Sequence, residues 1–431
     1  MDSQQFEVLR PLCAGLDVHK KSVVAAVCTS DPLILTASYK TKVFNTTNSD
    51  IHALCDWLLS QNCHDVCMES TGKYWIPIFN ILEPHMHVVL THPKYVKAIK
   101  GKKTDKRDAK WIANLFRFDI VKASFIPPPD IRALRELSRY RLKLSYMRTA
   151  EKNRYQNSMT ISRIRIDCVL TDPFGLSATR IMDYLLSDEP FDEETCRSLI
   201  DRRVKVSKDE VMDTIHGYHI LEEQKFKMTH AKAHINFINQ SIRETEAELF
   251  LRSRPYNTSI IRIATITGIT ELSALFILSE IGADMSVFES DRHLCSWAGL
   301  TPTNNESANK KKSTRCSKAG QYLKPLLIQC ALAAVKSKKE PYFAIKYQRL
   351  AKRRGKKKAI IAIARMMLTS IYHMLANKED FHPDDYEATV HPQKPQKTAL
   401  TLENTLQFLR EHGADPETLT LIQQQCIART G

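Results

Sequence analysis

The sequence predicts a mixed α/β domain followed by two largely helical regions. Three observations lead to this division. Short β-rich runs alternate with helical patterns over residues 11–125, a long helical pattern begins near residue 130 and resumes near 222, and apolar helices surround a basic loop within 256–380. A chain of 431 residues is long enough for several domains. We therefore expect domains at 11–125, 126–255 and 256–380, and a tail at 381–431.

The first domain begins with two apolar runs around a polar turn, which predicts a hairpin of strands Gly15–Val18 and Ser22–Cys28. A third strand is expected at 36–44. Further strands at 65–70 and 85–93 alternate with helical patterns at 49–61, 75–83 and 104–118. Ser49 or Asp50 is expected to cap the first of these helices, and Thr104 the last. Strands in hairpin order that then alternate with helices indicate a mixed sheet.

Two long helices are expected at 130–164 and 222–252, on either side of a break at Asp172–Gly175 and short helices within 177–215. This order is typical of a helical stalk or coiled-coil hairpin that carries an insert. Residues 260–282 resemble a helix-hairpin-helix element with its turn at Gly268. A short helix, a basic loop and an apolar helix follow, and the tail holds a linker and one amphipathic helix at 402–413.

Composition narrows the classes of partner. Lys plus Arg number 63 against 48 Asp plus Glu, so the formal net charge is +15, which favours a polyanionic partner over acidic metabolites. We find no run of about 18 apolar residues, so no membrane span is expected. The N-terminus has no signal-peptide pattern, and eleven cysteines lack a repeated short spacing. These features predict reduced thiols and a cytoplasmic location, in the bacterial cytosol or nucleoid.

Four carboxylates stand where strands end and where a helix begins. Asp17 ends the first strand, Glu69 ends the strand at 65–70, and Asp105 and Asp108 share one face of a helix's first turn. Such side chains can converge at one sheet edge and bind Mg²⁺, or Mn²⁺, for phosphate chemistry. The alternative is that they are exposed strand ends and a helix N-terminus where the dipole favours acids.

Basic residues cluster twice. Residues 94–110 hold eight Lys and Arg around two acids, and 306–358 hold seventeen around two acids. In a chain with this net charge we expect contacts with nucleic-acid backbone rather than merely solvated faces. The residues that we assign to such contacts are Lys102, Lys103, Lys106, Arg107, Lys310, Lys311, Lys312, Arg315, Lys318, Arg353, Arg354, Lys356, Lys357 and Lys358.

Several motifs together resemble one family. "GLDVHKKS", "MESTGKYWIPI" and "KTDKRDAKWIANLF" resemble the RuvC-like Asp-Glu-Asp-Asp (DEDD) module of insertion-sequence transposases of the one-ten type. "TITGITELSALFILSEIG" and "WAGLTPTNNESANKKKSTRCSKAGQYLKPLLIQCA" resemble the serine transposase domain of that family. Thr267 and Thr270 replace its usual Pro and second Gly, and Ala308 and Asn309 stand where small, Gly-rich residues are usual. The resemblance covers residues 12–165 and 220–375.

The resemblance implies a RuvC/RNase H-like N-terminal domain, a coiled-coil stalk and a mostly helical catalytic domain. It implies that Asp17, Glu69, Asp105 and Asp108 bind the metal and that Ser307 is the covalent nucleophile. It further implies transposition by DNA recombination between donor and target, a bridge RNA as guide, and a dimer or tetramer whose protomers share active sites.

Chemistry alone leaves Ser313 and Ser317 as rivals of Ser307, because a hydroxyl needs help to attack phosphorus. Two other functions stay open. A RuvC-like structure-specific nuclease would need the carboxylates but not Ser307. A non-catalytic nucleic-acid-binding protein derived from such an element would need neither.

Overall fold

The computed structural model describes residues 7–31, 36–69, 72–96, 104–302, 305–307, 310–313, 315–392 and 401–428. The chain divides into two compact units. Unit 1 comprises Met1–Asn257 and Leu278–Val287, and unit 2 comprises Thr258–Ile277 and Phe288–Gly431. The four-domain division drawn from the sequence stays a prediction.

Unit 1 begins with a five-stranded mixed sheet. Its strands are β1 (Leu12–Val18), β2 (Ser22–Ser30), β3 (Ala37–Asn45), β4 (Asp65–Glu69) and β5 (His87–Thr91), in the order β3-β2-β1-β4-β5. β1, β2 and β3 pair antiparallel, whereas β4 runs parallel to both β1 and β5. The mixed α/β sheet predicted from the sequence is confirmed.

Helices cover both faces of this sheet, which is why β1 and β2 are nearly continuous apolar runs. Leu16 and Met68 pack with α1 (Asn48–Ser60) and α2 (Trp75–Leu82) on one face. The alternate residues, such as Cys13 and Cys67, pack with α4 (Asp105–Arg117) on the other. The short helix α3 (Pro93–Val96) precedes α4.

The cap of α1 differs from the sequence expectation. Thr47, rather than Ser49 or Asp50, is the N-cap, because its Oγ1 accepts a hydrogen bond from the backbone N–H of Asp50. Thr104 occupies the N-cap position of α4 as expected, with extended backbone and a carbonyl that accepts from the N–H of Asp108, but its side chain makes no capping hydrogen bond.

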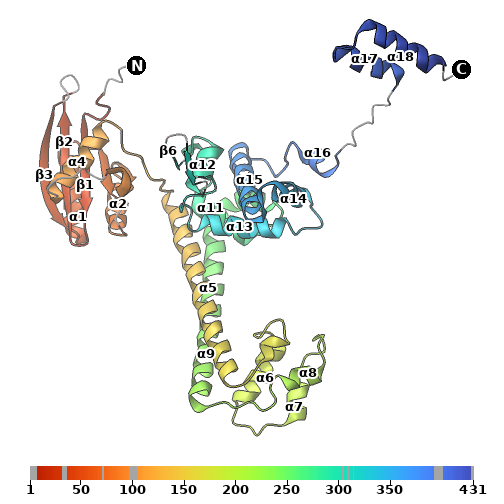
Figure 1. Ribbon diagram of the computed structural model, residues 1–431. Coiled ribbons are helices and arrows are strands. Elements are labelled where there is room, and N and C mark those ends of the chain that lie inside the picture. Colours follow the sequence, from red (N-terminus) through yellow and green to blue (C-terminus); the bar gives the residue numbers. More distant parts are fainter. Residues whose placement is uncertain are drawn as a thin grey trace. The chain divides into compact units, whose positions relative to one another are not determined.

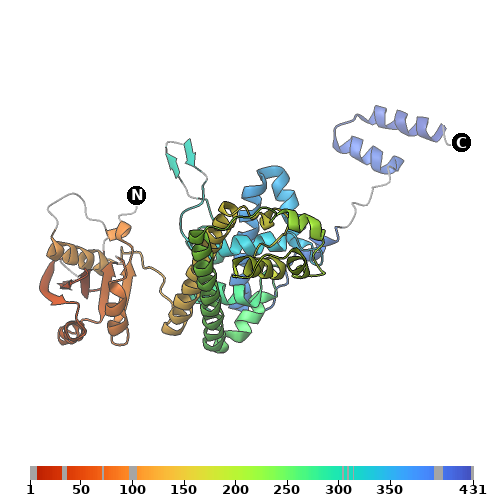
Figure 2. The ribbon, with the colours of Figure 1, turned by 90° about the horizontal axis from the view of Figure 1, so that it is seen from below.

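Two long helices follow, α5 (Pro129–Ile161) and α9 (Glu222–Arg252), which lie side by side in both Figure 1 and Figure 2. They run antiparallel, since Arg141 bonds Glu246 and Arg148 bonds Asn239. Leu144 packs against Ile238 and Ile242 midway along the pair. Between them the chain forms a 3₁₀ turn (Ile166–Cys168), α6 (Leu176–Leu186), α7 (Glu193–Ser198) and α8 (Lys208–Asp213), which share a core with the adjoining ends of α5 and α9.

Unit 2 is mostly helical. Helices α10 (Asn257–Ala264) and α11 (Glu271–Ile281) are joined at Gly268, which has a φ of +88°. A Cβ on Gly268 would lie 2.6 Å from the carbonyl oxygen of Cys330, so this turn packs on the backbone of a later helix. The remaining helices are α12 (Asp291–Trp297), α13 (Leu323–Ala334), α14 (Tyr342–Arg354), α15 (Lys356–Asn377) and α16 (Tyr386–Val390). Short 3₁₀ turns lie at Arg254–Tyr256 and Met285–Val287.

Helix α15 is, among the residues described, the one helix long and apolar enough to cross a membrane by length and composition. Its side chains Ile363, Met367 and Ile371 are fully buried, and it packs against α12, α13 and α14. That burial is typical of the core helix of a folded domain.

The tail holds α17 (Leu402–Glu411), which was expected, and α18 (Pro416–Ala428), which was not. Ten of the eleven cysteines, those whose side chains the structure describes, are free.

Candidate active site and nucleic-acid interface

The carboxylate site depends on a close approach between strand β1 and helix α4. A Cβ on Gly15 of β1 would lie 2.3 Å from the carbonyl oxygen of Ala109 and 2.4 Å from the amide nitrogen of Ala113. Real Cβ contacts essentially never fall under 3.0 Å, so only glycine permits this packing. The first turn of α4, with Asp105 and Asp108, is thereby held against the end of β1.

Asp17 lies two residues beyond Gly15, on the same face of β1. Its side chain is 12% exposed. Burial raises the pKa of Asp17 above its ordinary value of 3.8, the negative charges of Asp105 and Asp108 raise it further, and His19 partly offsets both effects. A carboxylate that is desolvated and crowded by like charges favours a cation beside it.

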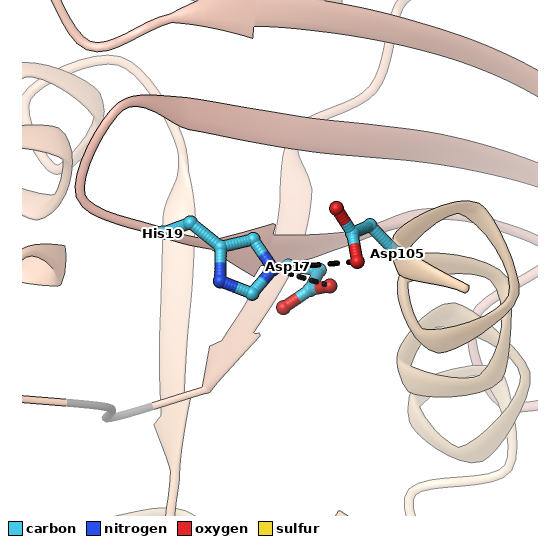
Figure 3. A group of neighbouring side chains, drawn as sticks. All are labelled: Asp17, His19 and Asp105. Carbon is cyan, nitrogen blue, oxygen red and sulfur yellow. Dashed lines mark hydrogen bonds and ion pairs between the residues drawn. The ribbon is translucent and has the colours of Figure 1, made fainter. Parts of the chain in front are cut away.

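Three side chains meet at this point, as Figure 3 shows. His19 Nε2 lies 3.2 Å from Asp17 Oδ2 and 3.6 Å from Asp105 Oδ1. One ligand atom from each residue falls within 4.8 Å of the others, a spacing that suits a metal ion. The structure therefore brings together two of the four predicted carboxylates and adds a histidine.

Glu69 and Asp108 flank this group. The β1–β4 ladder pairs Leu16 with Met68, so the next position in the same register places Asp17 beside Glu69. Neighbouring residues of parallel strands point to the same face, which directs the half-buried Glu69 side chain to the α4 side. Asp108 is half-buried one helical turn from Asp105, and it is close enough for its negative charge to raise the pKa of Asp17.

His19 is the residue that sequence reasoning missed. It lies in the "GLDVHKKS" motif, two positions after Asp17 in the hairpin turn, where its N–H bonds the carbonyl of Ser22. The spacing of two from a strand-end aspartate was the available signal, because alternate residues of extended chain share a face.

The candidate nucleophile Ser307 lies in unit 2, in a two-stranded hairpin of β6 (Asn305–Ser307) and β7 (Lys310–Ser313). Ser307 pairs with Lys310 in the ladder, and a bridge between Pro302 and Cys316 extends the hairpin toward its base. The side chains of Ser307, Lys310, Lys311, Lys312 and Ser313 lie outside the described part of the structure.

Two glycines allow close backbone contact at the base of this hairpin. Gly299 and Gly320 both have positive φ, +70° and +67°. A Cβ on Gly320 would lie 2.1 Å from the carbonyl oxygen of Ala298, and one on Gly299 would lie 2.4 Å from that of Ala319. The "WAGLTP" and "SKAG" segments therefore cross backbone against backbone, which accounts for a glycine in each motif.

Ser317 has a local role in that crossing. Its Oγ accepts a hydrogen bond from the backbone N–H of Ala319, and its carbonyl accepts one from Lys324 Nζ. This turn contact is what a hydroxyl in a loop commonly makes, so it gives Ser317 a structural task independent of catalysis.

Two family models match the chain, one over each of these sites. Residues 14–162 match the DEDD domain model of IS110 transposases, described as "Transposase". Residues 261–348 match a model described as "Transposase IS116/IS110/IS902 family". The chain is a DNA transposase that carries both domains of the IS110 family. A comparison with curated proteins found no match.

The transposase places its four candidate carboxylates within the first match and Ser307 within the second. The resemblance inferred from the sequence is thus confirmed at the level of both domains. A non-catalytic protein is not supported, because transposase domains indicate an enzyme.

Exposed cations of the transposase lie within both matched segments. Lys106 and Arg107 lie exposed in the first turn of α4, beside the carboxylates, and Arg315 and Lys318 are exposed near the hairpin. Lys102 and Lys103 fall outside the described residues. Each of these positions was assigned to nucleic acid from the sequence, and that assignment stays a prediction.

The densest basic block spans the junction of α14 and α15. Lys352, Arg353 and Arg354 end α14, where positive charge suits the helix dipole. Lys356, Lys357 and Lys358 begin α15, where positive charge opposes the dipole, and all three are exposed. Exposed lysines at this helix end are free to contact phosphates, and the assignment of all six residues to nucleic acid stays a prediction.

Proposed function

We propose that this transposase moves an insertion sequence by RNA-guided, site-specific recombination through a phosphoserine intermediate. The observation that carries the proposal is the convergence of Asp17 and Asp105, with Glu69 and Asp108 beside them, in a chain with both family domains. The N-terminal domain is assigned to the RuvC/RNase H-like fold, and the strand order β3-β2-β1-β4-β5 supports that assignment.

The donor set fits a hard divalent cation, Mg²⁺ or Mn²⁺. Carboxylate oxygens are the ligands that such ions prefer, and the raised pKa of Asp17 reflects a crowded, partly desolvated site that a cation would relieve. Asp17, Glu69, Asp105 and Asp108 would hold the metal, with His19 beside them. When bound, it would polarise a phosphate oxygen and stabilise the leaving oxygen.

Ser307 is assigned the covalent step. Its hydroxyl oxygen attacks a backbone phosphorus and loses its proton, while the bond from phosphorus to the 3′ oxygen breaks and that oxygen takes up a proton. The energy of the phosphodiester is kept in the serine ester. A 3′-hydroxyl of the partner strand then attacks the same phosphorus and releases the serine. Lysines and arginines near the hairpin would bind the neighbouring phosphates.

The partners follow from the same reasoning. Donor and target DNA and a non-coding guide RNA are proposed, with sequence read by base pairing while the protein grips backbones. Abundant exposed Lys and Arg support a backbone-binding role. A dimer or tetramer whose protomers share active sites is proposed from the family resemblance, since transposases commonly oligomerise. The enzyme would act in the bacterial cytosol.

The experiment that tests the chemistry uses DNA labelled beside the cut. The wild-type enzyme should give a labelled band that migrates with denatured protein. Ser307→Ala should lose the band, whereas Ser317→Ala, a matched loop serine, should keep most of it. Asp105→Asn should abolish strand exchange while nucleic-acid binding persists. If Ser307→Ala releases free cut ends at the wild-type rate, the enzyme is a water-using RuvC-like nuclease instead.

A further inference from the structure

The C-terminal tail forms a hairpin of two helices, α17 and α18, each with a side-chain N-cap. Thr401 Oγ1 accepts from the backbone N–H of Asn404 to cap α17, and Asp415 Oδ1 accepts from that of Thr418 to cap α18. Gly413, with a φ of +85°, turns the chain between the helices. The hairpin lies beyond both segments that match the transposase family.

This hairpin does not enclose an apolar interior. Leu402, Leu406 and Leu409 follow the helical spacing of one stripe on α17, and Leu419 and Ile422 do so on α18. Leu419 is buried, at 6% exposure, but the other four stay half-exposed. Two helices leave both sides of such a stripe open, and so short a unit rarely supplies a stable core alone.

Helix α17 is also complementary to itself. Glu403 and Arg410 are exposed and lie seven residues apart. Both flank the leucine stripe on the side nearest Leu406. If two copies of α17 pair antiparallel about an axis between positions 406 and 407, Glu403 of each copy faces Arg410 of the other. The leucine stripes then meet, and symmetry forms the charge pair twice.

We propose that the tail hairpin is a self-association site, in which α17 pairs antiparallel with α17 of a second copy and the two hairpins form a four-helix bundle. The occupant is a second copy because the stripe and the charges match under a two-fold axis. This inference does not depend on the proposed chemistry. It adds an interface between protomers that lies outside the two family domains.

The test uses the full chain with the photo-crosslinking residue p-benzoylphenylalanine in place of Thr405, which is half-exposed, shares a helix face with Leu402 and Leu409, and lies close to the proposed axis. Equal amounts of ¹⁵N-labelled and unlabelled protein are mixed, irradiated and digested. The expected product is a mixed-isotope adduct between two tail peptides. The same probe in place of Asn404, which lies on the side of α17 opposite the leucine stripe, is the matched control and should give little adduct. Adducts of one isotope only, or adducts to other segments, would show that the hairpin docks elsewhere.

A charge exchange tests the register. Glu403→Arg alone and Arg410→Glu alone should each lower the adduct yield by about tenfold, because both symmetric pairs become repulsive. The double variant should restore the yield, and so should a mixture of the two single variants, since unlike copies then pair. These exposed positions leave the leucine stripe intact, so folding is preserved. Yields that do not respond to charge, or that the double variant fails to restore, would overturn the antiparallel pairing.

Discussion

Gly15→Ala is the change that most directly tests how the fold positions the carboxylates. The new Cβ would start 2.3 Å from the carbonyl oxygen of Ala109 and 2.4 Å from the nitrogen of Ala113, both backbone atoms that cannot rotate away. Helix α4 must therefore retreat by about 1 Å to reach ordinary contact. Overpacking of this kind costs about 1–3 kcal/mol of folding free energy.

The displacement should cost more in catalysis than in stability. A retreat of α4 carries Asp105 and Asp108 away from Asp17, and a misplacement of about 1 Å in a catalytic group lowers rates by roughly 100-fold. We expect Gly15→Ala to fold, with a lowered denaturation midpoint, and to form the covalent DNA adduct about 100-fold more slowly. Raised Mg²⁺ should recover part of the rate, because the metal site is loosened rather than removed.

The matched control is Ala14→Val. Ala14 is fully buried one residue earlier in β1, but its side chain faces the core with α1 and α2. Overpacking there should cost a similar free energy without moving α4, so adduct formation should stay near the wild-type rate. If the two variants lose activity equally, or if Gly15→Ala is fully active and fully stable, the close approach does not position the site.

Three further predictions follow from the structure. Because the pKa of Asp17 is raised in the folded chain, the stability that its protonated form contributes is present below 3.8 and is lost as the pH rises through the folded pKa. Asp17→Asn should therefore raise the denaturant concentration at the unfolding midpoint of the metal-free protein at pH 7. The same measurement at lower pH should show this gain disappear as Asp17 of the wild type becomes protonated. Glu280→Ala should lower the free energy of unfolding, measured by chemical denaturation, by about 3 kcal/mol. Glu280 is buried and accepts two hydrogen bonds from Arg139, which the guanidinium would lose. An unchanged midpoint would contradict this. Replacing Lys356, Lys357 and Lys358 with Ala should weaken binding to all DNA sequences and lower the salt slope of log K by roughly 0.9 per lost phosphate contact, whereas an unchanged slope would mean that the block does not touch nucleic acid.

Much of the local structure was readable from the sequence. The strand hairpin, the helix at 104–118 and the helix at 222–252 depend on periodicity and turn residues within a few positions of each other. Helix caps and the tail were harder to predict: Thr47, rather than Ser49 or Asp50, caps α1, and α18 was not expected. Such details depend on competition among adjacent polar groups rather than on the hydrophobic pattern.

The candidate site divides in the same way. Residue types, order and spacing were enough to single out Asp17, Glu69, Asp105 and Asp108, because strand ends and helix first turns are local features. That Asp17 meets Asp105 was decided only in three dimensions, where Gly15 lets α4 approach β1 across almost a hundred residues of chain. His19 joined the group for the same reason.

The backbone crossing of Gly299 with Gly320 is likewise a tertiary fact behind two sequence motifs. Local sequence therefore determined which side chains and elements this transposase has. Tertiary packing decided which of them touch. Contacts between distant segments depend on how closely their backbones can approach, and the periodicity of the local sequence does not predict that distance.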